Sequence, residues 1–269
     1  MFGKFQKKLC FYCRLYKKII IAYLKIRLGY RLDFLVGFFG MLIKSASGII
    51  TLSIIFSNVP QIEGWSYYHL LFMYGLSSLV LIPVETFFVN AWALHTHIIQ
   101  GTFVKYCLKP INTMFFYFSE IVEIKSLLQL FISIPILIIS GKKMGIDWSF
   151  PLIGAYILYF ICGSIILISI YVMAASLGFW LMNSMSIINF AGQVINFSKY
   201  PISIYGTFLK AVFTYILPIG FVSYYPMMLM LGKISYGNVV QAIVTAILFG
   251  SVGCLIWHKG VEHYSGTGS

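Results

Sequence analysis

A few ionisable side chains interrupt the long apolar runs of this sequence, and they are its first candidates for chemistry. Lys44 lies near the middle of one run, Glu85 lies late in the next, and Glu120, Glu123 and Lys125 lie in a third. A charge inside an apolar segment is costly to bury, so it usually faces protein or water and marks a solute pathway. We therefore expect Lys44 and Glu85 to line such a pathway. The sequence is compatible with a pair between them across adjacent antiparallel helices but does not decide it. The alternative for Lys44 is structural, with its long side chain reaching out to the polar boundary.

A polar stripe is the second candidate. Asn189, Gln193 and Asn196 recur at spacings of four and three residues, which place them on one face of a helix. Such a face either lines a cavity or hydrogen-bonds to a neighbouring helix, and the sequence leaves both interpretations open.

Signatures of covalent chemistry are missing from the sequence. It contains no G-x-x-x-x-G-K-[ST] phosphate loop, no H-E-x-x-H zinc motif and no G-x-S-x-G nucleophile motif with partners. His95 and His97 are two residues apart, so they point to different helix faces and make poor co-ligands. Cys10 and Cys13 form a single C-x-x-C, which without further ligands is a weak zinc signal. We therefore predict no catalytic, cofactor or metal site and no enzymatic activity in this chain.

Composition indicates what kind of elements must position these residues. The chain has 269 residues, of which 60% are hydrophobic and 10% are charged, and its mean hydropathy is +0.90. Globular chains are about one-quarter charged. Backbone groups in lipid must pair within their own segment, so apolar runs of about 20 residues predict helices. The sequence thus predicts an all-α integral membrane protein, with residues 1–269 forming a single transmembrane domain.

Six apolar segments, the fifth of them short, predict six transmembrane helices. They cover residues 33–57, 66–90, 113–140, 149–180, 184–198 and 236–257. Residues 200–232 then place several prolines and glycines in an apolar background, which a straight spanning helix would not carry. Broken helices are tolerated at membrane depth where protein buries them or where they line water, so we expect re-entrant helices there, on the outer side.

The N-terminal region carries most of the charge asymmetry. Nine of the 19 Lys and Arg residues lie between positions 4 and 31. Within residues 8–31 basic residues alternate with apolar and aromatic ones at nearly helical spacing, which predicts an amphipathic helix on the membrane surface. The positive-inside rule then places both termini of a six-span chain in the cytoplasm. The basic charge therefore indicates membrane lipids as partners and not nucleic acid.

Two segments outside the straight spans are informative as strings. Residues 98–110 read IIQGTFVKYCLKP, which predicts a short amphipathic helix ended by a proline on the cytoplasmic side. Such a helix suits docking to a soluble partner, while the plainer interpretation is an ordinary connecting helix. The second segment comprises residues 197–206, FSKYPISIYG, and residues 216–226, ILPIGFVSYYP.

In these strings, and in its ending from Trp257 to Gly266, the sequence resembles permeases of the ABC-2 exporter superfamily. The resemblance is closest to the branch labelled viologen-exporter-type or uncharacterised ABC-2 permeases, and it covers nearly the whole chain. It implies an elbow helix at residues 8–31 and a coupling helix at residues 98–109 that meets an ATPase. Residues 200–232 would cap the pathway on the extracellular side. The 98–109 stretch offers lysines but no acid, so its docking charges depart from the family pattern.

The resemblance also implies particular residues and partners. The ATPase-coupling candidates are Gln100, Gly101, Thr102, Phe103, Lys105, Leu108, Lys109 and Pro110. The extracellular gate candidates are Tyr200, Pro201, Pro218, Tyr224, Tyr225 and Pro226. The partners would be two copies of an ABC ATPase, which bind ATP and Mg²⁺, and a second homologous permease that makes a heterodimer rather than a homodimer. The location would be the plasma membrane of a bacterial cell.

From these features we expect a permease subunit of an ATP-driven exporter that forms half of a translocation pathway. Its substrate would be hydrophobic or amphipathic, such as a drug, a lipid or a peptide. Three alternatives stay open: an ion-coupled secondary transporter, a substrate-capturing subunit of an importer, and an integral membrane enzyme. The two halves show no convincing match of the kind that inverted repeats give carriers, and acid–base groups are too sparse for an enzyme.

Overall fold

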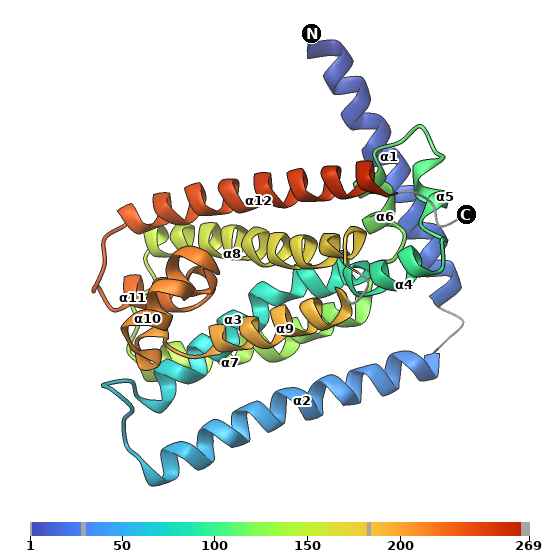
Figure 1. Ribbon diagram of the computed structural model, residues 1–269. Helices are drawn as coiled ribbons and strands as arrows, with labels where there is room; N and C mark the ends of the chain where they lie inside the picture. Colours follow the sequence, from blue (N-terminus) through green and yellow to red (C-terminus); the bar gives the residue numbers. More distant parts are fainter. Residues whose placement is uncertain (1, 28–30, 182–183, 265–269) are drawn as a thin grey trace.

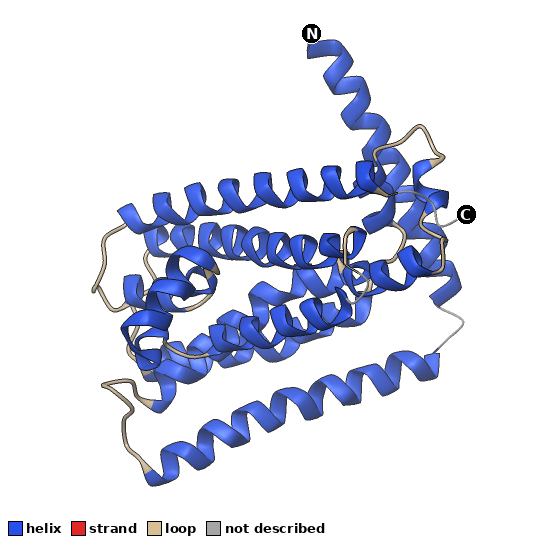
Figure 2. Cartoon of the chain, viewed as in Figure 1, coloured by secondary structure: helices blue, strands red, loops and turns tan. Residues whose placement is uncertain are grey.

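The computed structural model describes residues 2–27, 31–181 and 184–264. Within these ranges the chain is almost entirely helical and forms no strand, apart from an isolated bridge between Ile62 and Trp65 (Figure 2). Five helices of the described ranges are long and apolar enough to cross a membrane, and they cover Leu35–Asn58, Tyr67–Phe87, Ile124–Lys143, Phe150–Phe179 and Gly237–His263. These helices confirm the prediction of an all-helical integral membrane protein.

The long helices run alongside one another and form the body of the molecule (Figure 1). They are α2 (Arg31–Asn58), α3 (Tyr67–Phe87), α7 (Leu130–Lys143), α8 (Phe150–Ser176) and α12 (Gly237–His263). α8 is central, because it packs along α12 and also contacts α3 and α9 (Ser184–Asn196), while α3 packs along α7. α2 stands apart, and most of its side chains are exposed.

The two ends of this bundle hold different elements (Figure 1). One end, which α1 crosses and at which α12 finishes, is here called the terminal end. It carries α1 (Phe2–Arg27), η1 (Val89–Ala93), α4 (Leu94–Ile99), α5 (Val104–Cys107), α6 (Thr113–Ser119) and η3 (Leu177–Phe179). The opposite end, here called the far end, carries η4 (Phe197–Lys199), η5 (Ile202–Tyr205), α10 (Gly206–Ala211), η6 (Val212–Ile216), η7 (Ile219–Phe221) and α11 (Tyr224–Met230). The long helices therefore connect a terminal end, which carries α1 and several short helices, to a far end built from short helices.

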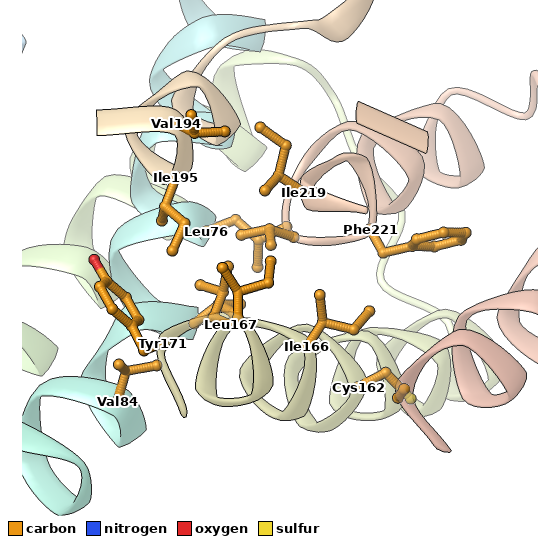
Figure 3. Packing of buried hydrophobic residues seen from close by; sticks show 14 of the residues in the cluster. Leu76, Val84, Cys162, Ile166, Leu167, Tyr171, Val194, Ile195, Ile219 and Phe221 are labelled. Carbon is orange, nitrogen blue, oxygen red and sulfur yellow. The ribbon is translucent and has the colours of Figure 1, made fainter. Parts of the chain in front are cut away.

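The core lies around the middle of α8. Ile166 and Leu167 are fully buried there, and they meet side chains from α3, α9 and η7 (Figure 3). Gly163 brings α8 close to α3, because a Cβ at this position would lie 3.0 Å from Cγ1 of Val80. Small residues at helix contacts allow the close backbone approach that holds membrane helices together.

The third predicted span, residues 113–140, is not one helix. α6 ends at Ser119, residues 120–123 are not helical, and the chain then resumes as η2 (Ile124–Gln129) and α7. A tertiary contact accompanies the break: the backbone N–H of Glu123 donates to the carbonyl oxygen of Thr86 at 2.9 Å instead of to its own helix. The apolar segment long enough to span begins at Ile124, and α6 belongs to the terminal end.

The fifth predicted span, residues 184–198, corresponds to the short helix α9. This helix has 13 residues. At 1.5 Å per residue it is about 20 Å long, whereas the hydrocarbon core of a bilayer is about 30 Å thick. The chain continues directly through η4 into the far end, so α9 and η4 together connect the two ends of the bundle (Figure 1).

The N-terminal helix α1 crosses the terminal end at a steep angle to the long helices (Figure 1). It covers most of the predicted elbow segment 8–31, of which residues 28–30 lie outside the described residues. The ring of Tyr12 packs 4.7 Å from that of Phe115, and the Tyr12 hydroxyl accepts a hydrogen bond from the backbone of Asn112 at 3.2 Å. These contacts fasten α1 to the segment that leads into α6.

Candidate functional site

The predicted coupling helix, residues 98–109, is two short helices and not one. α4 ends at Ile99, and α5 begins at Val104. Gly101 lies between them with φ of 67°, a left-handed conformation that favours glycine and ends helices. The turn is held by the backbone N–H of Phe103, which donates to the carbonyl oxygen of His97 at 3.1 Å. The glycine therefore turns the chain sharply at the terminal end.

Phe103, one of the predicted ATPase-coupling residues, does not face outwards. It is fully buried and lies in a group of rings here called the ring cluster. The cluster consists of Phe103, Tyr106, Tyr117, Phe118, Phe179, Trp257 and Tyr264. It joins the segment between α4 and α6 to the end of α8 and to the end of α12.

The ring cluster is tightly packed. Ring centroids lie 5.1 Å apart for Phe103 and Phe179 and 5.5 Å apart for Tyr117 and Trp257. Each such aromatic pair contributes about 0.5–1.5 kcal/mol beyond its buried area. A Cβ at Gly260 would lie 2.3 Å from Cδ2 of Phe179, so only glycine allows α12 this close to the cluster. The ring cluster therefore links this segment directly to the ends of α8 and α12.

An acid from outside the 98–109 stretch supplies its missing counter-charge. Oε1 of Glu120 lies 3.0 Å from Nζ of Lys105, and its other oxygen accepts a hydrogen bond from the hydroxyl of Tyr106. Burial and the hydrogen bond to this carboxylate raise the pKa of Tyr106. The sequence placed Glu120 within a span, and only the break after Ser119 brings it to the terminal end.

Besides burial, the charges of Lys105 and Glu120 affect the pKa of His97, near the end of α4. Burial lowers the pKa of His97, the positive charge of Lys105 lowers it further, and Glu120 partly opposes the shift. Its ring nitrogen Nδ1 lies 2.8 Å from the hydroxyl of Thr102, within hydrogen-bond distance. The neutral ring therefore fits the turn best.

The outward face of residues 99–110, here called the coupling face, is apolar and basic. Leu108 is 78% exposed, and Nζ of Lys109 lies over the ring of Phe116 at 4.3 Å. The exposed residues of the coupling face are Ile99, Gln100, Thr102, Val104, Lys105, Cys107, Leu108, Lys109 and Pro110. All predicted coupling residues apart from Phe103 and the half-buried Gly101 are in this set. The arrangement suits a partner with an apolar groove and acidic groups.

Lys44 and Glu85 lie together at a polar cavity between α2 and α3. Nζ of Lys44 is 3.8 Å from Oε1 of Glu85, and the two side chains are 72% and 36% exposed. The cavity has a volume of about 170 Å³. Its lining residues are Gly40, Met41, Lys44, Ser45, Tyr74, Ser78, Leu81, Glu85, Gln129 and Lys199. We call this the polar cavity.

The predicted polar stripe of α9 ends at this cavity. Asn189, Gln193 and Asn196 are all exposed on the outer face of α9. Oδ1 of Asn196 accepts a hydrogen bond from Nζ of Lys199 at 2.8 Å, and Lys199 lines the polar cavity. Sequence reasoning missed Lys199 as a site residue, although its position three residues after Asn196 continues the stripe.

The predicted gate residues are packed within the far end. Pro201, Pro218, Tyr224 and Pro226 are buried, and Tyr200 and Tyr225 are half-buried. The ring of Tyr224 lies 5.9 Å from that of Trp65. The carbonyl oxygen of Pro226 accepts a hydrogen bond from the hydroxyl of Tyr156 at 3.0 Å. The hydroxyls of Tyr225 and Thr214 lie 3.0 Å apart. In this structure the six residues are therefore packed against neighbouring side chains and backbone, and their role as a gate stays a prediction.

Comparison with known proteins decides the family. The model of the family described as ABC-2 family transporter protein matches residues 42–268, which is most of the chain. The chain belongs to the ABC-2 transporter family. Neither the search of curated proteins nor the search of solved structures gave a match.

The family assignment fixes the general role of this ABC-2 permease. It is an integral membrane transport component and not itself an ATPase, and its family implies association with an ABC ATPase. The coupling face and the far end lie within the matched range, and so do all the residues that line the polar cavity except Gly40 and Met41. α1 precedes that range, so the comparison leaves the elbow helix as a prediction.

Proposed function

We propose that this ABC-2 permease is the transmembrane subunit of an ATP-driven exporter and forms half of its translocation pathway. Two copies of an ABC ATPase would bind ATP and Mg²⁺ in the cytoplasm of a bacterial cell, and a second homologous permease would complete the membrane part as a heterodimer. The chain does no covalent chemistry in this scheme. Its resemblance to viologen-exporter-type permeases supports the direction of transport. The 24 Phe, 19 Tyr and 11 Met residues of the chain would suit a hydrophobic or amphipathic substrate, such as a drug, lipid or peptide.

The proposed topology has six crossings, with α9 and η4 together as the fifth. Both termini then lie in the cytoplasm, α1 lies on the inner membrane surface as the elbow helix, and residues 200–232 are re-entrant from outside. Two observations support this arrangement. α1 crosses the terminal end, at which α12 finishes, and nine of the 19 Lys and Arg residues lie between positions 4 and 31.

The observation that carries the proposal is the ring cluster behind the coupling face. Closure of the ATPases on ATP would push on residues 99–110. Packed interiors transmit displacement instead of absorbing it. The rings of Phe103, Phe179 and Trp257 would therefore pass the push to the ends of α8 and α12, and the free energy would come from the differential affinity of the partner for two states.

The polar cavity and the stripe of α9 are the proposed pathway. Exposed polar and charged groups at membrane depth need protein or water beside them. The exposed faces of α2 and α9 carry Lys44, Asn189, Gln193 and Asn196. A second permease that covers these faces would enclose them in a shared channel.

A co-purification experiment tests this proposal. We would express the chain together with its neighbouring genes, either as the wild type or with Leu108→Asp or Lys109→Glu on the coupling face. The complex is then purified in detergent. Both substitutions should reduce recovery of the ATPase at least tenfold while the permease still inserts. Lys142→Glu is the matched control, because Lys142 is an exposed lysine at the opposite end of the bundle. Normal recovery of the ATPase with both coupling-face variants would contradict the assignment of residues 99–110.

One observation favours a second candidate, an ion-coupled carrier. Lys44 and Glu85 pair at a cavity at membrane depth, as proton- or ion-coupling groups do. Transport in proteoliposomes of the purified chain alone, driven by a pH or sodium gradient, would support the carrier. Transport that requires the ATPase and ATP would exclude it. Substrate capture for an importer would instead show as ATP-driven uptake and not export.

A further inference from the structure

We propose that the polar cavity binds the anionic group of an amphipathic substrate, held by Lys199 and Lys44. This inference rests on the proposed function, because it specifies the class of molecule that the permease would carry.

Charged groups from three separate segments converge on the cavity. Lys44 comes from α2, Glu85 from α3 and Lys199 from η4. Two uncharged residues that line the cavity are joined by a hydrogen bond: the side-chain amide of Gln129 donates to the hydroxyl of Ser45 at 3.2 Å. Convergence of polar groups from elements far apart in the sequence is the usual property of a binding site.

The charges of the cavity do not balance. Lys44 has Glu85 at 3.8 Å, whereas the direct contacts of the Lys199 ammonium group are with uncharged groups and Glu85 acts on it only from beyond ion-pair distance. Its Nζ donates to Oδ1 of Asn196 and lies 5.7 Å from the ring centroid of Tyr74. Among the described residues, no carboxylate lies within ion-pair distance of Lys199. An amide and an aromatic face orient an ammonium group without neutralising it, so the cavity keeps one net positive charge.

The sign of this charge selects the ligand. A cationic group would meet two ammonium groups, and the carboxylate of Glu85 already faces one of them. An anionic group would complete the charge balance and accept hydrogen bonds from Lys199, and hydrogen bonds to charged groups are the strong ones. A carboxylate or a phosphate monoester fits this description.

The size of the cavity indicates how much of the ligand it holds. Its volume of about 170 Å³ is below the roughly 300–1,000 Å³ of pockets that enclose whole drug-sized molecules. It therefore accommodates a charged end group. Met41 and Leu81 line the same cavity, so apolar atoms adjoin the charged groups. A ligand with an anionic end and an apolar body matches both features.

The test measures binding to the full chain in nanodiscs of zwitterionic lipid. The probes are radiolabelled dodecyl phosphate, dodecanoate, dodecyltrimethylammonium and inorganic phosphate. We expect saturable binding of the two anionic amphiphiles and none of the cation or of inorganic phosphate. Lys199→Gln should weaken binding of dodecyl phosphate about tenfold, as loss of one charged hydrogen bond predicts. Lys199→Arg should retain most of the affinity.

Two further variants make the result specific. Glu85→Gln should strengthen binding of dodecyl phosphate severalfold, because it removes the competing negative charge; a cation site would instead lose affinity. Lys210→Gln is the matched control, because Lys210 is exposed on α10 and does not line the cavity, and it should bind as the wild type does. The thermal stability of each variant is recorded, so that misfolding is separated from lost binding.

Three results would overturn the inference: equal binding of cationic and anionic amphiphiles, saturable binding of inorganic phosphate without need of an apolar chain, or weaker binding in Glu85→Gln. The assay contains no ATPase. Failure to bind anionic amphiphiles therefore contradicts this inference alone, whereas failure of the ATPase to co-purify contradicts the proposed function alone.

Discussion

The ring of Phe103 lies 5.1 Å from the ring of Phe179, in an edge-on arrangement that joins the turn after α4 to the end of α8. The rings of Trp257 in α12 and of Tyr264 just after it also pack on Phe103, with centroid distances of 6.1 and 5.1 Å. Phe103, one of the predicted ATPase-coupling residues, therefore lies behind the coupling face and packs on rings at the ends of α8 and α12. In the proposed coupling, this packing would pass a displacement of residues 99–110 to these two helices.

Truncation of Phe103 should destabilise the protein. Phe103→Ala removes a fully buried ring from the ring cluster, and such changes cost about 3–5 kcal/mol in packed cores. The temperature at which half of the detergent-solubilised protein aggregates should fall clearly. Leu108→Ala is the control, because Leu108 is 78% exposed and its change should stay within about 0.5 kcal/mol. Equal effects of the two substitutions would contradict this packing role of Phe103.

The contact of α12 with Phe179 gives a second prediction. Gly260→Ala places a Cβ 2.3 Å from Cδ2 of Phe179, so either the ring or the helix must move, at a cost of about 1–3 kcal/mol. Gly154→Ala provides a matched control, because a Cβ there meets nothing within 4 Å. The denaturation temperature should fall in Gly260→Ala, whereas in Gly154→Ala it should be unchanged or slightly higher. A stable Gly260→Ala protein would show that this helix contact is loose.

The histidine at the end of α4 predicts a pH dependence. The pKa of His97 is lowered from its ordinary value of 6.5 by burial and by Lys105, so between the two pKa values the unfolded chain binds more protons than the native one. The contribution of His97 to stability is therefore complete above pH 6.5 and is lost as the pH falls through the lowered native value. His97→Gln should flatten the fall in denaturation temperature between pH 7 and pH 5. An unchanged slope in this variant would contradict the assignment.

The ion pair beside the coupling face should matter more for binding than for stability. Lys105 and Glu120 are 49% and 40% exposed, and pairs of that kind contribute about 0–1 kcal/mol. Glu120→Gln should therefore change the denaturation temperature little. It should make the coupling face more positive, so that recovery of the ATPase becomes more sensitive to salt. If recovery of the ATPase depends on salt in Glu120→Gln as it does in the wild type, the charge of Glu120 does not contribute to docking of the ATPase.

The bundle of long apolar helices was predictable from hydropathy, because lipid dictates long apolar helices wherever the chain crosses it. The break at residues 120–123 was not, because the contact that accompanies it, a hydrogen bond from Glu123 to Thr86, is tertiary. No local signal marks it: the stretch contains neither proline nor glycine.

The candidate site was predicted in part. Lys44 and Glu85 were recognisable because a charge in an apolar run stands out, and their 3.8 Å separation follows from adjacent helices. The inward orientation of Phe103 could not be predicted, since Gly101 takes a left-handed conformation and changes the face that each following residue presents. Lys199 was overlooked because it follows the span instead of lying inside it.

Site-specific photo-crosslinking tests the central claim, that the coupling face docks the ABC ATPase. A photoreactive residue is placed at Leu108 on the coupling face or at Trp148, which is 45% exposed at the opposite end of the bundle. The complex is irradiated in membranes with and without ATP, and products are identified by mass. We predict a permease–ATPase product from position 108, with a yield that changes with ATP, and none from position 148. Failure to crosslink the ATPase from position 108, or equal yields from both positions, would contradict the account.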